Sequence, residues 1–129
     1  MPVREQFELI APAANSEGHF DARQVATLLA WPLEDVANFL DRPKSTVYRN
    51  PDAPGTQDAL GRLVGLFQDM AKLLAPPQKE ALSALAATRA WFKTAIYALD
   101  GKSPKERILA GDIESVRRLV NEYSSGLAF

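Results

Sequence analysis

Proline and glycine cut this chain into short segments, and within each segment the apolar residues recur at helical spacing. No run alternates between apolar and polar residues with the β-branched enrichment that is typical of a strand. A chain of this kind can bury its apolar residues only by packing short helices against one another. We therefore expect an all-α fold.

Capping residues and breaks give the expected helix boundaries. Asp21, Thr56, Ser103 and Asp112 are each placed to cap the start of a helix. Ser103 is followed by proline and, three residues after the cap, by Glu106, which predicts a capping box. Helices are expected over residues 22–30, 33–40, 44–49, 57–75, 82–99, 104–110 and 113–125. The helical stretch over 82–99 is expected to close at Gly101, either continuous or with a break near Thr88, and the last helix to end at Gly126.

The proline- and glycine-rich segment Asn50–Gly55 is the clearest linker in the chain. It suggests three parts. Residues 1–19 form a loosely ordered N-terminal arm, residues 20–55 a helix-turn-helix region with the linker, and residues 56–129 a helical region for dimerisation and partner binding. Whether the first helices pack on the helix after the linker is left open by the sequence.

Composition excludes several classes of function. The chain has 129 residues, 47% of them hydrophobic, and no cysteine, so it has neither a disulfide framework nor a thiolate metal site. His19 is the only histidine, and no phosphate-binding loop or nucleophile motif is present. The apolar runs are far shorter than the ~20 residues of a membrane span, and the N-terminus lacks the pattern of a signal peptide. We expect a cytoplasmic non-enzyme with no catalytic residue, cofactor, metal or membrane contact.

The segment from Leu33 to Asn50 has the spacing of a helix-turn-helix. Ala37 is small enough to let the second helix cross closely, and Val47 is placed to pack back against the first. Asp41 stands where the turn usually has glycine, and aspartate tolerates the left-handed backbone that such a turn needs. Asn50-Pro51 predicts a short second helix. If this motif reads DNA, the contacting residues are Arg42, Lys44, Ser45, Thr46, Tyr48 and Arg49.

The same pattern fits an ordinary helical hairpin with solvated basic residues. Residues 1–56 carry five basic and eight acidic side chains, so their overall field opposes DNA and binding would need a local patch. Residues 87–129 carry seven basic and five acidic side chains.

The C-terminal third resembles the Xre/MbcA/ParS antitoxin family. The resemblance covers residues 87–129, and more loosely the helix-turn-helix before them. It is carried by Trp91-Phe92, by Leu99-Asp100-Gly101-Lys102-Ser103-Pro104, by Gly111-Asp112 and by Val116-Arg117-Arg118-Leu119. The family often has Pro-Asn a few residues after the tryptophan, where this chain has Ala95-Ile96.

This resemblance implies a toxin-binding module and a partner. Such antitoxins neutralise a RES-domain toxin that degrades NAD⁺, by placing their C-terminal end in its active-site cleft. A cleft built for an anionic dinucleotide should accept basic side chains. The toxin contacts implied are Lys102, Arg107, Arg117, Arg118, Tyr123, Ser124, Ser125, Gly126, Leu127 and Phe129, with Ala128 between the last two. Autorepression through operator DNA and a homodimer are expected with them.

Two other interpretations remain. The serine, proline and glycine punctuation can be helix capping alone, and Trp91 and Phe92 fit a core better than an interface. As a whole, the chain can also be a helix-turn-helix transcription regulator without a toxin partner, which uses its C-terminal helices only to dimerise.

Overall fold

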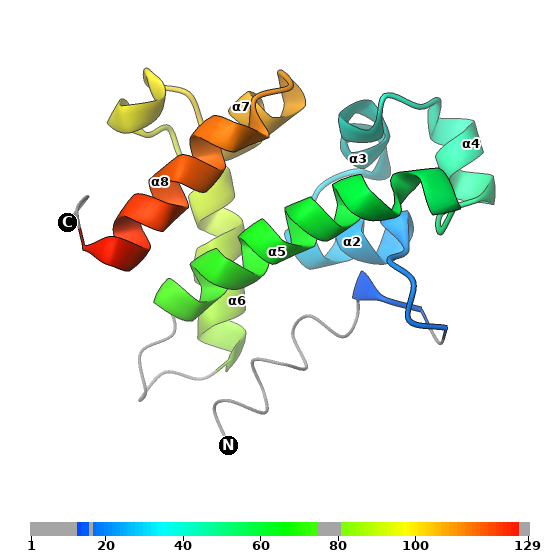
Figure 1. Ribbon diagram of the computed structural model, residues 1–129, viewed down its shortest axis with the longest axis horizontal. Coiled ribbons are helices and arrows are strands. Elements are labelled where there is room, and N and C mark those ends of the chain that lie inside the picture. Colours follow the sequence, from blue (N-terminus) through cyan, green and yellow to red (C-terminus); the bar gives the residue numbers. More distant parts are fainter. Residues whose placement is uncertain (1–12, 16, 75–80, 127–129) are drawn as a thin grey trace. The chain divides into compact units, whose positions relative to one another are not determined.

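The computed structural model describes residues 13–15, 17–74 and 81–126, with the backbone alone at 81–83 (Figure 1). Every regular element in that part of the chain is a helix, which confirms the all-α prediction. Two isolated antiparallel bridges, Ala14–Phe20 and Ile96–Lys102, are the strand-like pairings found there. The chain divides into two compact units, Met1–Gln68 and Asp69–Phe129. Residues 1–12 of the predicted arm lie outside the described residues.

Helix α2 (Ala22–Leu29) begins and ends with well-defined caps. The Asp21 carboxylate accepts hydrogen bonds from the backbone N–H groups of Arg23 and Gln24, as its position in the sequence predicts. At the other end, Ala30 has a left-handed backbone with φ of 57°, and its N–H bonds back into the helix. The helix buries one face, which includes Val25, Leu28 and Leu29.

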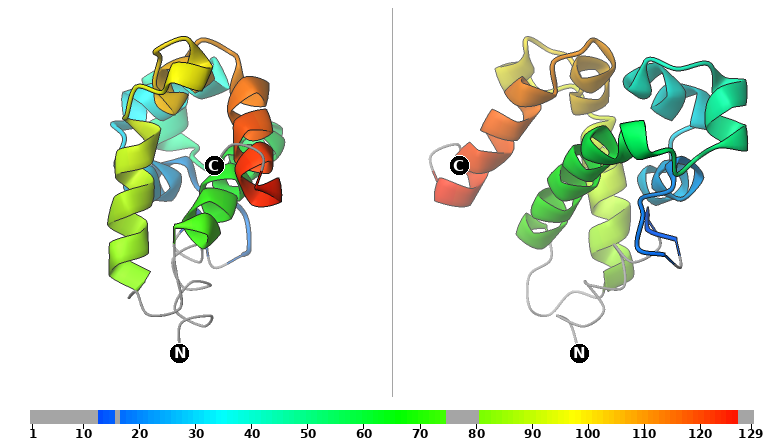
Figure 2. Two further views of the ribbon diagram at one scale, coloured as in Figure 1. Left: turned by 90° about the vertical axis from the view of Figure 1, so that its left-hand side faces the viewer. Right: turned by 45° about the vertical axis from the view of Figure 1, so that its right-hand side comes forward.

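Helices α3 (Leu33–Leu40) and α4 (Lys44–Arg49) follow with the predicted bounds, and Figures 1 and 2 show them side by side. Residues 41–43 connect them. Asp41 has φ of 55° and ψ of 47°, so it adopts the left-handed conformation expected of it. Its N–H donates to the Asn38 carbonyl and that of Arg42 to the Ala37 carbonyl, which fixes the angle at which α4 leaves α3.

The predicted linker is bound to the start of α2. The backbone N–H of Ala22 donates to the Pro51 carbonyl at 2.8 Å, and the amide of Asn15 donates to the Asp52 carboxylate at 3.0 Å. The Gln57 side chain bonds both the N–H and the carbonyl of Phe20. The segment therefore lies inside the first unit.

Helix α5 (Gln57–Leu73) carries the main apolar stripe of the first unit and continues past its end. Leu60, Leu63 and Phe67 are fully buried at the predicted period. Thr56 was expected to cap this helix. Instead it ends the short 3-10 helix η2 (Pro54–Thr56), and its hydroxyl donates to the Ala53 carbonyl at 2.7 Å.

The helix predicted from 82 to 99 ends earlier than expected, and the break left open near Thr88 is absent. Helix α6 (Ala81–Phe92) runs unbroken through Thr88, whose hydroxyl is satisfied by the Ala84 carbonyl, and it ends at Phe92. A separate 3-10 helix, η3 (Tyr97–Leu99), follows. The chain turns back because Asp100 and Gly101 both have positive φ, which pairs Ile96 with Lys102.

Helices α7 (Pro104–Leu109) and α8 (Ile113–Ser125) begin at the predicted caps. Ser103 and Glu106 form the predicted capping box, with both hydrogen bonds at 3.1 Å. Asp112 accepts from the N–H of Ser115 at 3.2 Å, and Gly126 ends α8 with φ of 79°. Ile108, Val116 and Val120 are buried where these two helices meet.

Two glycines in α5 provide a matched test of packing. A Cβ at Gly61 would lie 3.2 Å from the Phe20 ring, whereas one at Gly65 would meet nothing within 4 Å. Because alanine is the better helix former, Gly65→Ala should raise the free energy of unfolding by about 1 kcal/mol. Gly61→Ala should gain clearly less, because the ring must shift. Urea unfolding followed by circular dichroism checks both, and an equal gain at the two sites would show that Phe20 does not press on Gly61.

Candidate functional site

The six predicted DNA contacts lie on one turn and one short helix. Helix α4 buries only Val47, and it exposes most of the rest of its surface. Tyr48 is 60% exposed, which is unusual for a large aromatic side chain. Lys44, Ser45 and Arg49 are exposed, and Arg42 and Thr46 are half-buried. The structure therefore brings these six residues together on a surface that is largely open to solvent.

Arg42 lies close to the segment that follows α4. Its guanidinium lies over the backbone of Gly55, so closely that a Cβ there would be 2.6 Å from the nearest nitrogen. Gly55, in the segment after α4, thus leaves room for the side chain of Arg42, in the turn before α4. Nothing in the local sequence indicates this contact, because it joins two segments on either side of α4.

Sequence reasoning missed Arg23. Its guanidinium carbon lies 5.6 Å from the centroid of the Tyr48 ring, which is within the range of a cation–π contact. Arg23 belongs to α2 and Tyr48 to α4, and no spacing rule connects the two positions.

The predicted toxin contacts fall into different settings. Lys102, Arg117 and Arg118 are exposed, and Arg117 has one weak partner, Glu114, at 3.4 Å. The hydroxyls of Ser124 and Ser125 donate to backbone carbonyls one turn back, and Gly126 serves as the cap of α8. Leu127, Ala128 and Phe129 lie outside the described residues.

Arg107 is held within the second unit. Its guanidinium lies 3.5 Å from the Asp100 carboxylate and 3.7 Å from that of Asp112 (a pair of contacts that links the turn before α7 to the start of α8). The side chain is 29% exposed, and its Nε is buried without a hydrogen-bond partner among the described residues. Arg107 therefore stabilises the packing of α7 against the turn before it and the start of α8, and only part of its side chain is open to a partner.

The carboxyl groups that cap α7 and α8 are held in their ionised form. The backbone N–H and the hydroxyl of Ser103 lower the pKa of Glu106. The hydroxyl and backbone N–H of Ser115 lower the pKa of Asp112, with weaker contributions from Arg107 and Arg118. Because the folded state lowers both pKa values, this stabilisation is present above the ordinary range of carboxyl groups and is lost as pH falls through the lowered values.

Trp91 and Phe92 pack against each other at the end of α6. Phe92 is fully buried and Trp91 is half-buried, with their ring centroids 5.0 Å apart and nearly perpendicular. The Trp91 ring also meets Tyr123 of α8 at 6.1 Å. Tyr123 is thereby tied to α6, so one of the predicted toxin contacts also holds the unit together. Tyr97 in η3 is 98% exposed, and its local sequence does not predict this exposure.

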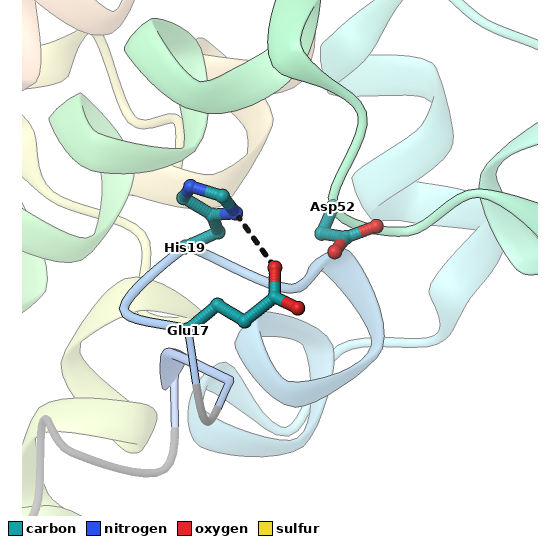
Figure 3. A group of neighbouring side chains, drawn as sticks. All are labelled: Glu17, His19 and Asp52. Atoms are coloured by element: carbon teal, nitrogen blue, oxygen red, sulfur yellow. Dashed lines mark ion pairs between the residues drawn. The ribbon is translucent and has the colours of Figure 1, made fainter.

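His19 has two acidic neighbours, Glu17 and Asp52 (Figure 3). The His19 Nδ1 lies 3.7 Å from the Glu17 carboxylate, and the donor atoms of all three residues lie within 4.8 Å of one another. Such a set offers one nitrogen and two oxygens to a cation. Glu17 and His19 are exposed, however, and Asp52 already accepts a hydrogen bond from Asn15, so we assign no cation to this group.

Comparison with protein-family models, with curated proteins and with solved structures found no match to this chain. Among the described residues, no helix is both long and apolar enough to cross a membrane.

Alanine substitutions can show whether Arg107 contributes more to stability than an exposed arginine of α8 does. Arg107→Ala should lower the free energy of unfolding by about 1–2 kcal/mol, because it removes two ion pairs and the packing of the side-chain stem. Arg118→Ala, at an exposed position of α8, should change it by less than about 0.5 kcal/mol. Thermal unfolding of the two variants checks this, and equal stability would contradict the structural role of Arg107.

Proposed function

We propose that this protein is an antitoxin that acts in the cytoplasm as a homodimer. In this proposal α3 and α4 form a helix-turn-helix that binds operator DNA. The second unit and the tail that follows Gly126 bind a RES-domain toxin and occlude the cleft in which it degrades NAD⁺. The observation that carries the DNA-binding half is the surface of α4, which buries one side chain and exposes basic and hydroxyl groups.

The dimensions of α4 suit the major groove. An α-helix with its side chains is about 10–12 Å across, which fits a groove about 12 Å wide. The six residues of α4 extend over roughly 9 Å along the helix axis. The helix begins at Lys44, directly after Pro43, and the first residues of a recognition helix are those that reach base edges in other proteins. Arg42, Lys44 and Arg49 supply positive charge for phosphates, and Ser45, Thr46 and Tyr48 supply hydrogen-bonding groups.

The toxin-binding half is supported by the resemblance and by exposed charge on α8. Arg117 and Arg118 are exposed side chains of a helix whose buried face is Val116, Leu119 and Val120. Exposed guanidinium groups can bind the anionic groups that line or occupy a dinucleotide cleft. Gly126 ends α8 with a left-handed backbone.

The DNA-binding half has a direct test. The double variant Lys44→Ala/Arg49→Ala should weaken binding to the DNA upstream of its own gene by at least about tenfold, and should reduce the salt dependence by about two phosphate contacts. Arg62→Ala removes an exposed cation from α5, where it pairs with Asp58, and should leave binding unchanged. Fluorescence anisotropy over a salt series measures both. Unchanged binding of the double variant would refute the recognition-helix assignment.

The toxin-binding half is tested at the tail, without disturbing α8. Deletion of residues 127–129 spares Tyr123, which packs on Trp91, and spares the Gly126 cap. Full-length protein should suppress NAD⁺ consumption by the product of the adjacent gene. The deletion variant should fail to do so while keeping its circular dichroism spectrum.

Arg117→Ala/Arg118→Ala should weaken protection in the same assay, and Lys105→Ala on α7 is the matched charge control. Full protection by the deletion variant would contradict occlusion by the tail. Absence of any complex with the adjacent product would favour a transcription regulator without a toxin partner.

A further inference from the structure

We infer that Arg23 and Tyr48 form a second DNA-binding element, in which the guanidinium of α2 binds a backbone phosphate beside the groove that α4 enters. This inference rests on the proposed DNA-binding function. It adds to the proposed surface a cation from an element outside the helix-turn-helix.

The contact between the two side chains fixes the position of Arg23. Its guanidinium carbon is 5.6 Å from the Tyr48 ring centroid, and its Nε is 3.9 Å from the Asp21 carboxylate. An arginine held on an aromatic face loses less conformational entropy when it binds a ligand than one that moves freely in solvent. The side chain of Arg23 is therefore preorganised for binding a ligand.

Arg23 still has donors available. Its side chain is 52% exposed, and among the described residues its terminal nitrogens make no hydrogen bond or ion pair. A guanidinium carries five N–H donors, and its planar fork matches two phosphate oxygens. Asp21 binds it weakly, because the contact is to Nε at 3.9 Å and the same carboxylate oxygen accepts two backbone hydrogen bonds from the start of α2.

The position of Tyr48 places Arg23 on the proposed DNA-binding surface. Lys44 and Tyr48 are four residues apart on α4, so they share a face of that helix. Arg23 stacks on this same face through Tyr48 and extends it toward α2. Three basic side chains are few for a chain whose first 56 residues are acidic overall, and a fourth from another element increases the local positive charge where DNA needs it.

DNA is favoured over a protein partner because the pair combines an exposed aromatic face with a fixed cation. Helix α4 carries hydroxyl and basic side chains beside it, and no exposed aliphatic side chain of that helix adds an apolar patch that a protein interface would use. Contacts to sugar and phosphate by arginine, tyrosine, serine and threonine are the common mode of positioning on a duplex.

The test measures binding to the DNA upstream of the gene at several salt concentrations. Arg23→Ala should weaken binding about five- to tenfold at low salt, and should reduce the slope of log K against log salt by about 0.9, the value of one phosphate contact. Arg62→Ala, which removes another exposed cation of the same unit, should change neither value. Circular dichroism confirms that each variant is folded.

Tyr48 variants test the pairing itself. Tyr48→Phe keeps the aromatic face and should retain most of the contribution of Arg23, whereas Tyr48→Ala should remove it. The double variant Arg23→Ala/Tyr48→Ala should then be less impaired than the product of the two single effects. Independent effects of the two substitutions would refute the pairing.

The proposed function and this inference fail in different ways. Loss of binding by Lys44→Ala/Arg49→Ala with wild-type affinity and slope for Arg23→Ala overturns the inference and leaves the proposed function standing. If the wild-type protein does not bind the upstream DNA at all, both are overturned.

Discussion

Short helices are the constraint on which this structure depends. Among the described residues, α2 and α3 have eight residues each, and α4 and α7 have six. Helices of this length are not stable in water by themselves, because nucleation costs more than a few hydrogen bonds return. Each must therefore bury an apolar face and satisfy its terminal N–H and carbonyl groups. Both surfaces to which we assign function rest on elements that tertiary contacts hold in place.

The sequence was informative at most of the helix boundaries that a single capping side chain decides, with Thr56 as the exception. Asp21, Ser103, Asp112 and Gly126 act within a turn of their own position, so their roles as caps follow from local chemistry. The end of α6 at Phe92 was mispredicted, because the chain leaves the helix in a turn at Lys93-Thr94 that has neither glycine nor proline to mark it. Apolar residues at helical spacing continue through that turn, so periodicity alone does not show the break.

Sites were harder to predict than helices, for a related reason. Composition identifies basic residues but does not show how each is used. Arg107 was expected to contact a toxin, and the structure also places it between two carboxylates. Arg23 was not predicted as a binding residue, because its contact with Tyr48 joins two different helices. The six residues around α4 were found together because they are adjacent in sequence and lie on one short helix after a turn.

Two of the left-handed residues lie at the ends of helices that lead to α4. Ala30 closes α2 and Asp41 closes α3, and neither is glycine. For alanine, which has no side-chain group to offset it, this conformation costs about 1 kcal/mol. This conformational strain is relieved only when α2 to α4 unfold. Partial unfolding of α2 to α4 is therefore less unfavourable than its buried residues alone would suggest, and the amide protons of these helices should exchange with solvent through openings smaller than the unfolding of the whole chain. The proposed DNA-binding surface would then be lost in the same openings.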